Sequence, residues 1–147
     1  MAEIQQEICP ITTDDLFIIL DHINAKFEYP IHCHPEYEIN VVMNIDGKRV
    51  VGDSEETFSK LDFVMVGPYI PHVWKSDEEE NRVVTIQFSS ELLNFHIMNK
   101  RLFTPIKKLL IDSRQGLQFY GPDAERIKDE ILELYLNFIC QTFIKTK

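Results

Sequence analysis

The chain has 147 residues, about the length of a single domain with one hydrophobic core. Hydrophobic residues make up 44% of the sequence and charged residues 27%, which excludes wholesale disorder and a chain built only of collagen-like or coiled-coil repeats. The net charge of −9 would repel a nucleic-acid backbone, so this chain is not expected to bind DNA by itself.

The sequence shows no sign of export or membrane insertion. It contains no apolar run of about 18 residues or more, and it begins with acidic residues where a signal peptide has a basic stretch. The three cysteines, Cys9, Cys33 and Cys140, have neither metal-binding nor redox spacing and are expected to be reduced thiols. We therefore expect a cytoplasmic protein with no membrane partner.

Short antiparallel strands are predicted up to about Phe88. β-Branched and aromatic residues are concentrated in this part, and turn residues separate the runs. Asp46-Gly47 is the strongest hairpin signal, and the acidic residues 77–80 are expected at a solvated tip. Strands joined in this way favour a closed barrel or a sandwich. The predicted strands are Tyr37 to Ile45, Arg49 to Gly52, Phe63 to Val66, His72 to Lys75 and Arg82 to Phe88.

Helices are predicted from Ser89 onward. Ser89 or Ser90 can cap a first helix, and Thr104-Pro105 begins a second one that stops at Gly116. The longest helix follows Gly121-Pro122-Asp123 and has a heptad-like apolar stripe. We expect this stripe to form a dimer interface, and the alternative is that it packs on the chain's own strands. The stripe consists of Ile127, Ile131, Leu134 and Phe138.

Candidate metal ligands lie between Phe27 and Asn40. Side chains alternate faces in an extended chain, so His32, His34 and Glu38 can project to one side. His72 follows a proline turn, and a returning strand can place it opposite them. Three imidazoles and one carboxylate suit a divalent transition metal such as zinc, iron, manganese or nickel.

The same alternation also fits a strand with one solvent-facing side. His34, Glu38, Asn40 and Asn44 would then form the polar face of that strand. Trp74 shares a face with His72 on a regular strand, where it can stack on a flat ligand or simply pack in the core. Spacing alone leaves these alternatives open. The opposite face carries Tyr37, Ile39, Val41, Met43 and Ile45.

The motif residues resemble those of two related families. His32, His34, Glu38 and His72 resemble the metal motifs of the cupins, which are small double-stranded β-helix barrels. HCHPEYEIN, Asp46-Gly47 and PYIPHVW together more closely resemble the N-terminal sensor domains of AraC-type bacterial transcription regulators, over about residues 15–140. One departure is Leu61-Asp62, where the family usually has Gly-Asp. The resemblance implies one domain, with a cupin-type double-stranded β-helix barrel at residues 1–90 and C-terminal helices at residues 91–147.

The resemblance also implies a function without catalysis. The barrel would bind a small polar effector, such as a sugar or another metabolite, and the helices would form a homodimer and relay binding to a helix-turn-helix DNA-binding domain, expected beyond Lys147. A divalent transition metal is a candidate cofactor. The effector-binding residues implied are His32, His34, Glu38, Asn40, His72 and Trp74, and the metal ligands among them are His32, His34, Glu38 and His72. The alternative is a stand-alone metal-dependent cupin enzyme, such as a dioxygenase or a sugar isomerase.

Overall fold

A computed structural model describes residues 3–143, with side chains as far as residue 139, so the thiol of Cys140 lies outside the described part. Strands account for more than a third of the chain. They are β1 (Gln5–Gln6), β2 (Phe17–Ile23), β3 (His32–Cys33), β4 (Tyr37–Val51), β5 (Ser54–Val66), β6 (His72–Lys75), β7 (Arg82–Phe88) and β8 (Leu117–Phe119). The α-helices are α1 (Thr104–Asp112) and α2 (Pro122–Phe143), and the 3-10 turns are η1 (Ser90–Asn94), η2 (His96–Asn99), η3 (Arg101–Phe103) and η4 (Ser113–Gln115).

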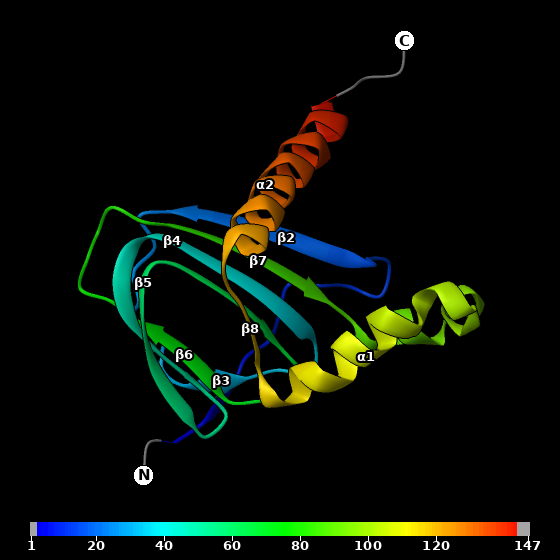
Figure 1. Cartoon of the computed structure of the whole chain (residues 1–147), viewed down its shortest axis with the longest axis horizontal. Helices are drawn as coiled ribbons and strands as arrows, with labels where there is room; N and C mark the ends of the chain where they lie inside the picture. Colours follow the sequence, from blue (N-terminus) through cyan, green and yellow to red (C-terminus); the bar gives the residue numbers. More distant parts are fainter. Residues whose placement is uncertain (1–2, 144–147) are drawn as a thin grey trace.

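The strands form one sheet that folds over into two layers (Figure 1). The long hairpin of β4 and β5 takes part in both. At its open end β4 pairs with β7, which pairs with β2, while β5 pairs with β8. Near its turn β4 pairs with β6, which continues to β3 and β1. No pairing among residues 3–143 closes the sheet, so the barrel is sandwich-like rather than closed. The predicted architecture, mainly β with C-terminal helices, is confirmed.

Hydrophobic residues form one core between the layers and another on the outside. The outer core joins β2, β4 and β7 to α2, and Val41 and Met43 belong to it. The inner core includes Val42 and Trp74. Both faces of β4 are therefore buried, which is why this strand is apolar on alternate residues and yet places its polar residues inside the protein.

The predicted turn at Asp46-Gly47 is wrong. β4 continues through these residues, and the chain reverses at Gly52-Asp53. Gly52 has a φ of 62°, which favours glycine in a tight hairpin. Gly47 is needed for a different reason, because a Cβ at this position would lie 2.6 Å from the carbonyl oxygen of Lys75.

A β-bulge interrupts the alternation of β4. Asn44 and Ile45 together oppose Lys60, and the φ angles of Asn44 and Lys60 are 72° and 62°. The extra residue reverses the faces of the strand, so Met43 lies in the outer core and Ile45 in the inner one. The expectation that Met43 and Ile45 share a face is therefore wrong.

The predicted helices are present, with one change at the first. The Ser89 side chain accepts a hydrogen bond from the N–H of Glu91 as predicted for a cap, but 3-10 turns follow it instead of an α-helix. The helix α1 begins at Thr104, has Pro105 in its first turn, and leads through η4 to Gly116, whose φ is 76°. Figure 1 shows α2 crossing the layer of β2 and β7 and then extending away from it.

Much of the apolar stripe of α2 contacts the chain's own sheet. Ile131 is buried in the outer core, Ile127 packs against it, and the ring of Phe138 lies 5.9 Å from that of a phenylalanine in β2. By contrast, 46% of Leu134 and 61% of Leu136 is exposed. Packing on the chain's own strands therefore accounts for part of the stripe and leaves Leu134 exposed, and Leu136, outside the stripe, is exposed as well.

The different roles of Gly47 and Gly52 predict opposite tolerances to asparagine. Gly47→Asn introduces a Cβ against the backbone of β6 and should lower the free energy of unfolding by about 1–3 kcal/mol. Gly52→Asn should cost about 1 kcal/mol or less, because asparagine tolerates a positive φ and the site has room. Urea unfolding of both variants measures this, and a larger loss for Gly52→Asn would contradict the position of the turn.

Candidate functional site

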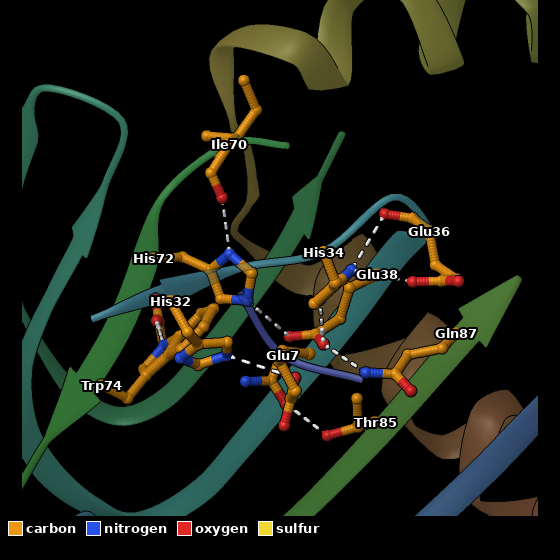
Figure 2. A network of polar contacts seen from close by, with 12 residues as sticks. Glu7, His32, His34, Glu36, Glu38, Ile70, His72, Trp74, Thr85 and Gln87 are labelled. Atoms are coloured by element: carbon orange, nitrogen blue, oxygen red, sulfur yellow. Dashed lines mark hydrogen bonds and ion pairs between the residues drawn. The ribbon is translucent and has the colours of Figure 1, made fainter. Parts of the chain in front are cut away.

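Three imidazoles converge inside the protein where β3 meets β6 (Figure 2). His32 in β3 pairs with His72 in β6, and His34 directly follows β3. Ligand nitrogens of the three side chains all lie within 4.8 Å of one another. His34 and His72 are each only 1% exposed, whereas His32 is partly buried. We call these three residues the imidazole cluster.

Each imidazole is oriented by a backbone carbonyl two residues away. In chain order, their Nδ1–H groups donate to the carbonyl oxygens of Pro30, Glu36 and Ile70, at 2.9, 3.2 and 2.8 Å. A carbonyl only accepts hydrogen bonds, so Nδ1 carries a proton and Nε2 of a neutral ring keeps its lone pair. Metal-binding histidines are commonly oriented in the same way.

Glu38 on β4 places a buried carboxylate beside the imidazole cluster. Its Oε2 lies 3.1 Å from Nε2 of His34 and accepts a hydrogen bond from the amide of Gln87 at 2.9 Å. Its Oε1 lies 3.7 Å from Nε2 of His72. Of the residues that the resemblance implies as metal ligands, the structure thus brings His32, His34 and His72 together, and Glu38 approaches His34 and His72 (Figure 2).

The charges of these residues depend on one another. Burial lowers the pKa of His34, but the hydrogen bond and negative charge of Glu38 outweigh burial and raise that pKa overall. Burial in turn raises the pKa of Glu38, but its contacts with His34, His72 and Gln87 leave that pKa below its ordinary value. For His72 burial dominates and lowers the pKa to about 4, so this ring is neutral near pH 7.

Three buried polar atoms at the site lack hydrogen-bond partners among the described residues. They are Nε2 of His72, Oε1 of Gln87 and Oε2 of Glu36, which lies 3.6 Å from Nδ1 of His34. A buried donor or acceptor without a partner is costly, and each such atom in a folded protein calls for an explanation. Several imidazole nitrogens beside a carboxylate are a donor set that suits zinc and related transition metals. The residues present therefore fit a divalent metal ion or a polar group of a small ligand.

The other two predicted effector-binding residues have partners of their own. Asn40 lies two residues beyond Glu38 on the same face of β4, and its Oδ1 accepts a hydrogen bond from the hydroxyl of Thr85 at 2.8 Å. Trp74 packs in the inner core with its ring centroid 5.8 Å from that of His72, and its indole N–H donates to Asp62 at 2.7 Å. Trp74 thus packs in the core, and its role in effector binding stays a prediction.

The solvent-facing alternative for β4 is wrong at the residues that matter. His34, Glu38 and Asn40 are all buried, and only Asn44, at the bulge, is exposed. Because these polar side chains are buried, the interior of the protein is polar near the imidazole cluster.

Sequence reasoning missed three polar residues around the cluster. Thr85 and Gln87 are alternate residues of β7 that face Asn40 and Glu38 across the sheet, and their alternation with apolar residues was an available signal. Glu7 lies 3.5 Å from Nε2 of His32, and nothing in the sequence pattern predicts that contact. It arises from a parallel pairing of the short strands β1 and β3.

Comparisons with known proteins identify the fold. No protein-family model matches the chain, and no curated protein matches it. Among solved structures, ToxT from Vibrio cholerae is similar, with a TM-score of 0.51 and 12% identity over 85% of this chain and 55% of ToxT. A cupin 2 conserved barrel domain protein from Salinispora arenicola aligns with a TM-score of 0.45 and 19% identity, over 64% of this chain and 80% of that protein.

The similarity to ToxT, an AraC-family regulator, is one of fold. The chain spans about half the length of ToxT, at 55%. The chain therefore shares its fold with the part of this regulator to which it aligns, which agrees with the resemblance of the motif residues. Within the described residues no helix is both long and apolar enough to cross a membrane.

The low pKa of His72 predicts that acid destabilises the metal-free protein. The folded state resists protonation of this ring until about pH 4, whereas the unfolded state takes up a proton near pH 6.5. Stability is therefore lost as the pH falls between these values, by about 3 kcal/mol in total. His34 has a raised pKa and acts in the opposite direction.

The contribution of His72 is isolated by comparison with His72→Gln. Urea unfolding in EDTA from pH 7 to pH 4 should show a steeper loss for the native sequence than for the variant. Equal slopes would show that the imidazole is not held neutral by burial.

Proposed function

We propose that this chain is the ligand-sensing domain of an AraC-type transcription regulator and that it binds a small polar effector at the imidazole cluster. The observation that carries the proposal is that two buried atoms beside the imidazole cluster, Nε2 of His72 and Oε1 of Gln87, have no hydrogen-bond partner among the described residues. Most buried polar atoms in folded proteins have partners, and a hydroxyl or another hydrogen-bond donor of a ligand would satisfy these two acceptors. The fold shared with ToxT supports the regulator class.

A divalent transition metal fits this site. His32, His34 and His72 would hold it through nitrogen atoms, with Glu38 as the carboxylate ligand. When bound, it would act as a Lewis acid that orients an oxygen atom of the effector. The chain's own residues would complete recognition. Gln87 would accept a hydrogen bond through its unused Oε1, and burial of the surrounding side chains would exclude water.

The same strands that line the site also contact α2, which suggests how binding is relayed. Glu38 and Asn40 face the interior, while Ile39 and Val41 on the same strand pack in the outer core with α2. A ligand that shifts β4 or β7 would therefore shift the seat of this helix. Such coupling requires the ligand to bind one arrangement of the helix more tightly than another.

We further propose that the chain forms homodimers in the cytoplasm and that a DNA-binding domain of the full-length regulator receives the signal. The support for dimerisation is Leu134 of the apolar stripe, which is 46% exposed, while Leu136, 61% exposed, lies on another face of α2. Apolar side chains left in solvent on a helix are commonly covered in an assembly. The net charge of −9 supports assigning DNA contact to another domain.

A metal-dependent enzyme is the second candidate, and the donor set of the imidazole cluster favours it. If the chain were an enzyme, adding the metal should produce turnover of a bound ligand, and His34→Ala should abolish both metal binding and turnover. A sensor should bind its effector without converting it. Analysis of a bound ligand after incubation distinguishes the two.

Effector binding is tested with a panel of sugars, hydroxy acids and other small polar metabolites, with and without zinc, cobalt, manganese or nickel. A ligand should raise the melting temperature in proportion to its affinity. Calorimetry should then show affinity about tenfold lower for Gln87→Leu, because a polar contact is lost and an apolar group takes its place. The control His22→Leu changes an exposed histidine on β2 and should bind normally. Equal affinities for both variants would contradict the proposed site.

The dimer is tested by placing a charge on the exposed apolar residues of α2. The double variant Leu134→Glu, Leu136→Glu should shift a dimer to a monomer in sedimentation analysis, because burial of the new carboxylates at an interface is costly. The control Asn137→Glu adds the same charge at an exposed polar position of the helix. A native chain that is monomeric at micromolar concentration would overturn the dimer proposal.

A further inference from the structure

The N-terminal segment carries a carboxylate to the imidazole cluster. The strand β1 pairs in parallel with β3, and the N–H of Glu7 donates to the carbonyl oxygen of Cys33 at 3.0 Å. This pairing places Oε2 of Glu7 3.5 Å from Nε2 of His32. Figure 2 shows Glu7 reaching the cluster beside His32.

The contact between Glu7 and His32 brings two hydrogen-bond acceptor atoms together, Oε2 of Glu7 and Nε2 of a neutral His32. The Nδ1–H of His32 donates to the carbonyl oxygen of Pro30, so a neutral ring presents the lone pair of Nε2 to the carboxylate. Two electron-rich atoms at this distance repel unless a positive charge lies between them. A proton on His32 is one such charge, and a metal cation is the other.

Two further observations favour the cation. Nε2 of His72 is buried without a hydrogen-bond partner among the described residues, and a proton on His32 would leave it so. Glu7 reaches the cluster through His32, because its Oε2 lies 3.5 Å from Nε2 of that ring, and a ligand nitrogen of His32 lies within 4.8 Å of those of His34 and His72. Glu7 is also within that distance of a nitrogen of His34, in a second group of possible ligand atoms completed by the thiol of Cys9.

We propose that Glu7 is a ligand of the divalent metal ion held by the imidazole cluster and that cation binding stabilises the pairing of residues 5–9 with β3. The inference rests on the metal site proposed above and extends it with a carboxylate from the N-terminal segment. Glu38 approaches His34 and His72, whereas Glu7 approaches His32, so the two carboxylates complete different parts of the site. The Glu7 side chain is 28% exposed, which leaves the site open to entry of the ion.

The test uses the full chain stripped with EDTA and titrated with Zn²⁺ and Co²⁺ by calorimetry. Glu7→Gln should weaken cation binding about tenfold or more, because the loss of a residue that only orients a metal ligand already lowers metal affinity by about that factor. Glu3→Gln, an exposed glutamate on the same segment, is the matched control for charge. Cys9→Ser is the control for the neighbouring thiol. Both controls should bind the cation as the native sequence does.

Amide hydrogen exchange supplies a readout that is independent of affinity. The N–H groups of Gln5 and Glu7 donate across to the backbone around β3, at 3.1 and 3.0 Å. Saturating Zn²⁺ should slow their exchange in the native sequence and in both controls, and it should leave their exchange unchanged in Glu7→Gln.

The outcomes separate this inference from the metal site itself. If the native chain binds the cation, His72→Leu abolishes binding and Glu7→Gln does not weaken it, the metal site stands and Glu7 forms only an ion pair with His32. A loss confined to Cys9→Ser would instead make the thiol the ligand and overturn the role of Glu7. If the native chain binds neither cation, the proposed metal site fails and the role of Glu7 fails with it.

Discussion

The position of β4, buried on both faces, is the constraint on which the rest of the structure depends. Its inner face carries Glu38 and Asn40, and its outer face carries Val41 and Met43. Packed cores resist deformation, so the polar interior and the seat of α2 cannot move independently. The bulge at Asn44 then lets the strand continue from one layer of the sheet into the other. The proposed site and the helix α2 therefore lie against opposite faces of the same strand.

The interior contains two charged networks that differ in completeness. Asp62 accepts from Trp74 through one oxygen and from Arg49 through the other, so both of its oxygens have partners, although burial still raises its pKa. Glu38 has comparable support from His34 and Gln87, yet Nε2 of His72 and Oε1 of Gln87 remain without partners in the described structure. A complete polar network is rigid and structural, whereas an incomplete one has capacity for a ligand. This difference supports the proposed site at Glu38 and His72 rather than one at Asp62.

Local pattern predicted much of the fold. The apolar runs of β4, β6 and β7 and the helix starts at Ser89 and Pro122 follow from alternation, helical periodicity and capping. The hairpin turn was misplaced because Asp46-Gly47 has turn chemistry but serves a close approach to β6, a tertiary requirement that no local pattern reveals. The bulge is invisible for the same reason, and it reverses every face assigned beyond it.

The site was predictable only in part. The parity of His34 and Glu38 shows that they can face the same side, but it does not show whether that side is buried. Burial depends on the second layer of the sheet, which β3 and β6 supply. Gln87 and Thr85 alternate with apolar residues along β7, but this pattern alone is too weak to suggest a role. Glu7 has none, since a two-residue parallel pairing leaves no periodicity.

The ion pair of Arg49 and Asp62, with the indole of Trp74 bonded to the same carboxylate, lies next to the imidazole cluster. Asp62 and Arg49 are 0% and 5% exposed, and the ring centroid of Trp74 lies 5.8 Å from that of His72. Removing one partner of a buried ion pair costs about 3–5 kcal/mol. Loss of Arg49 would therefore disturb Trp74 and, through its ring, the surroundings of His72.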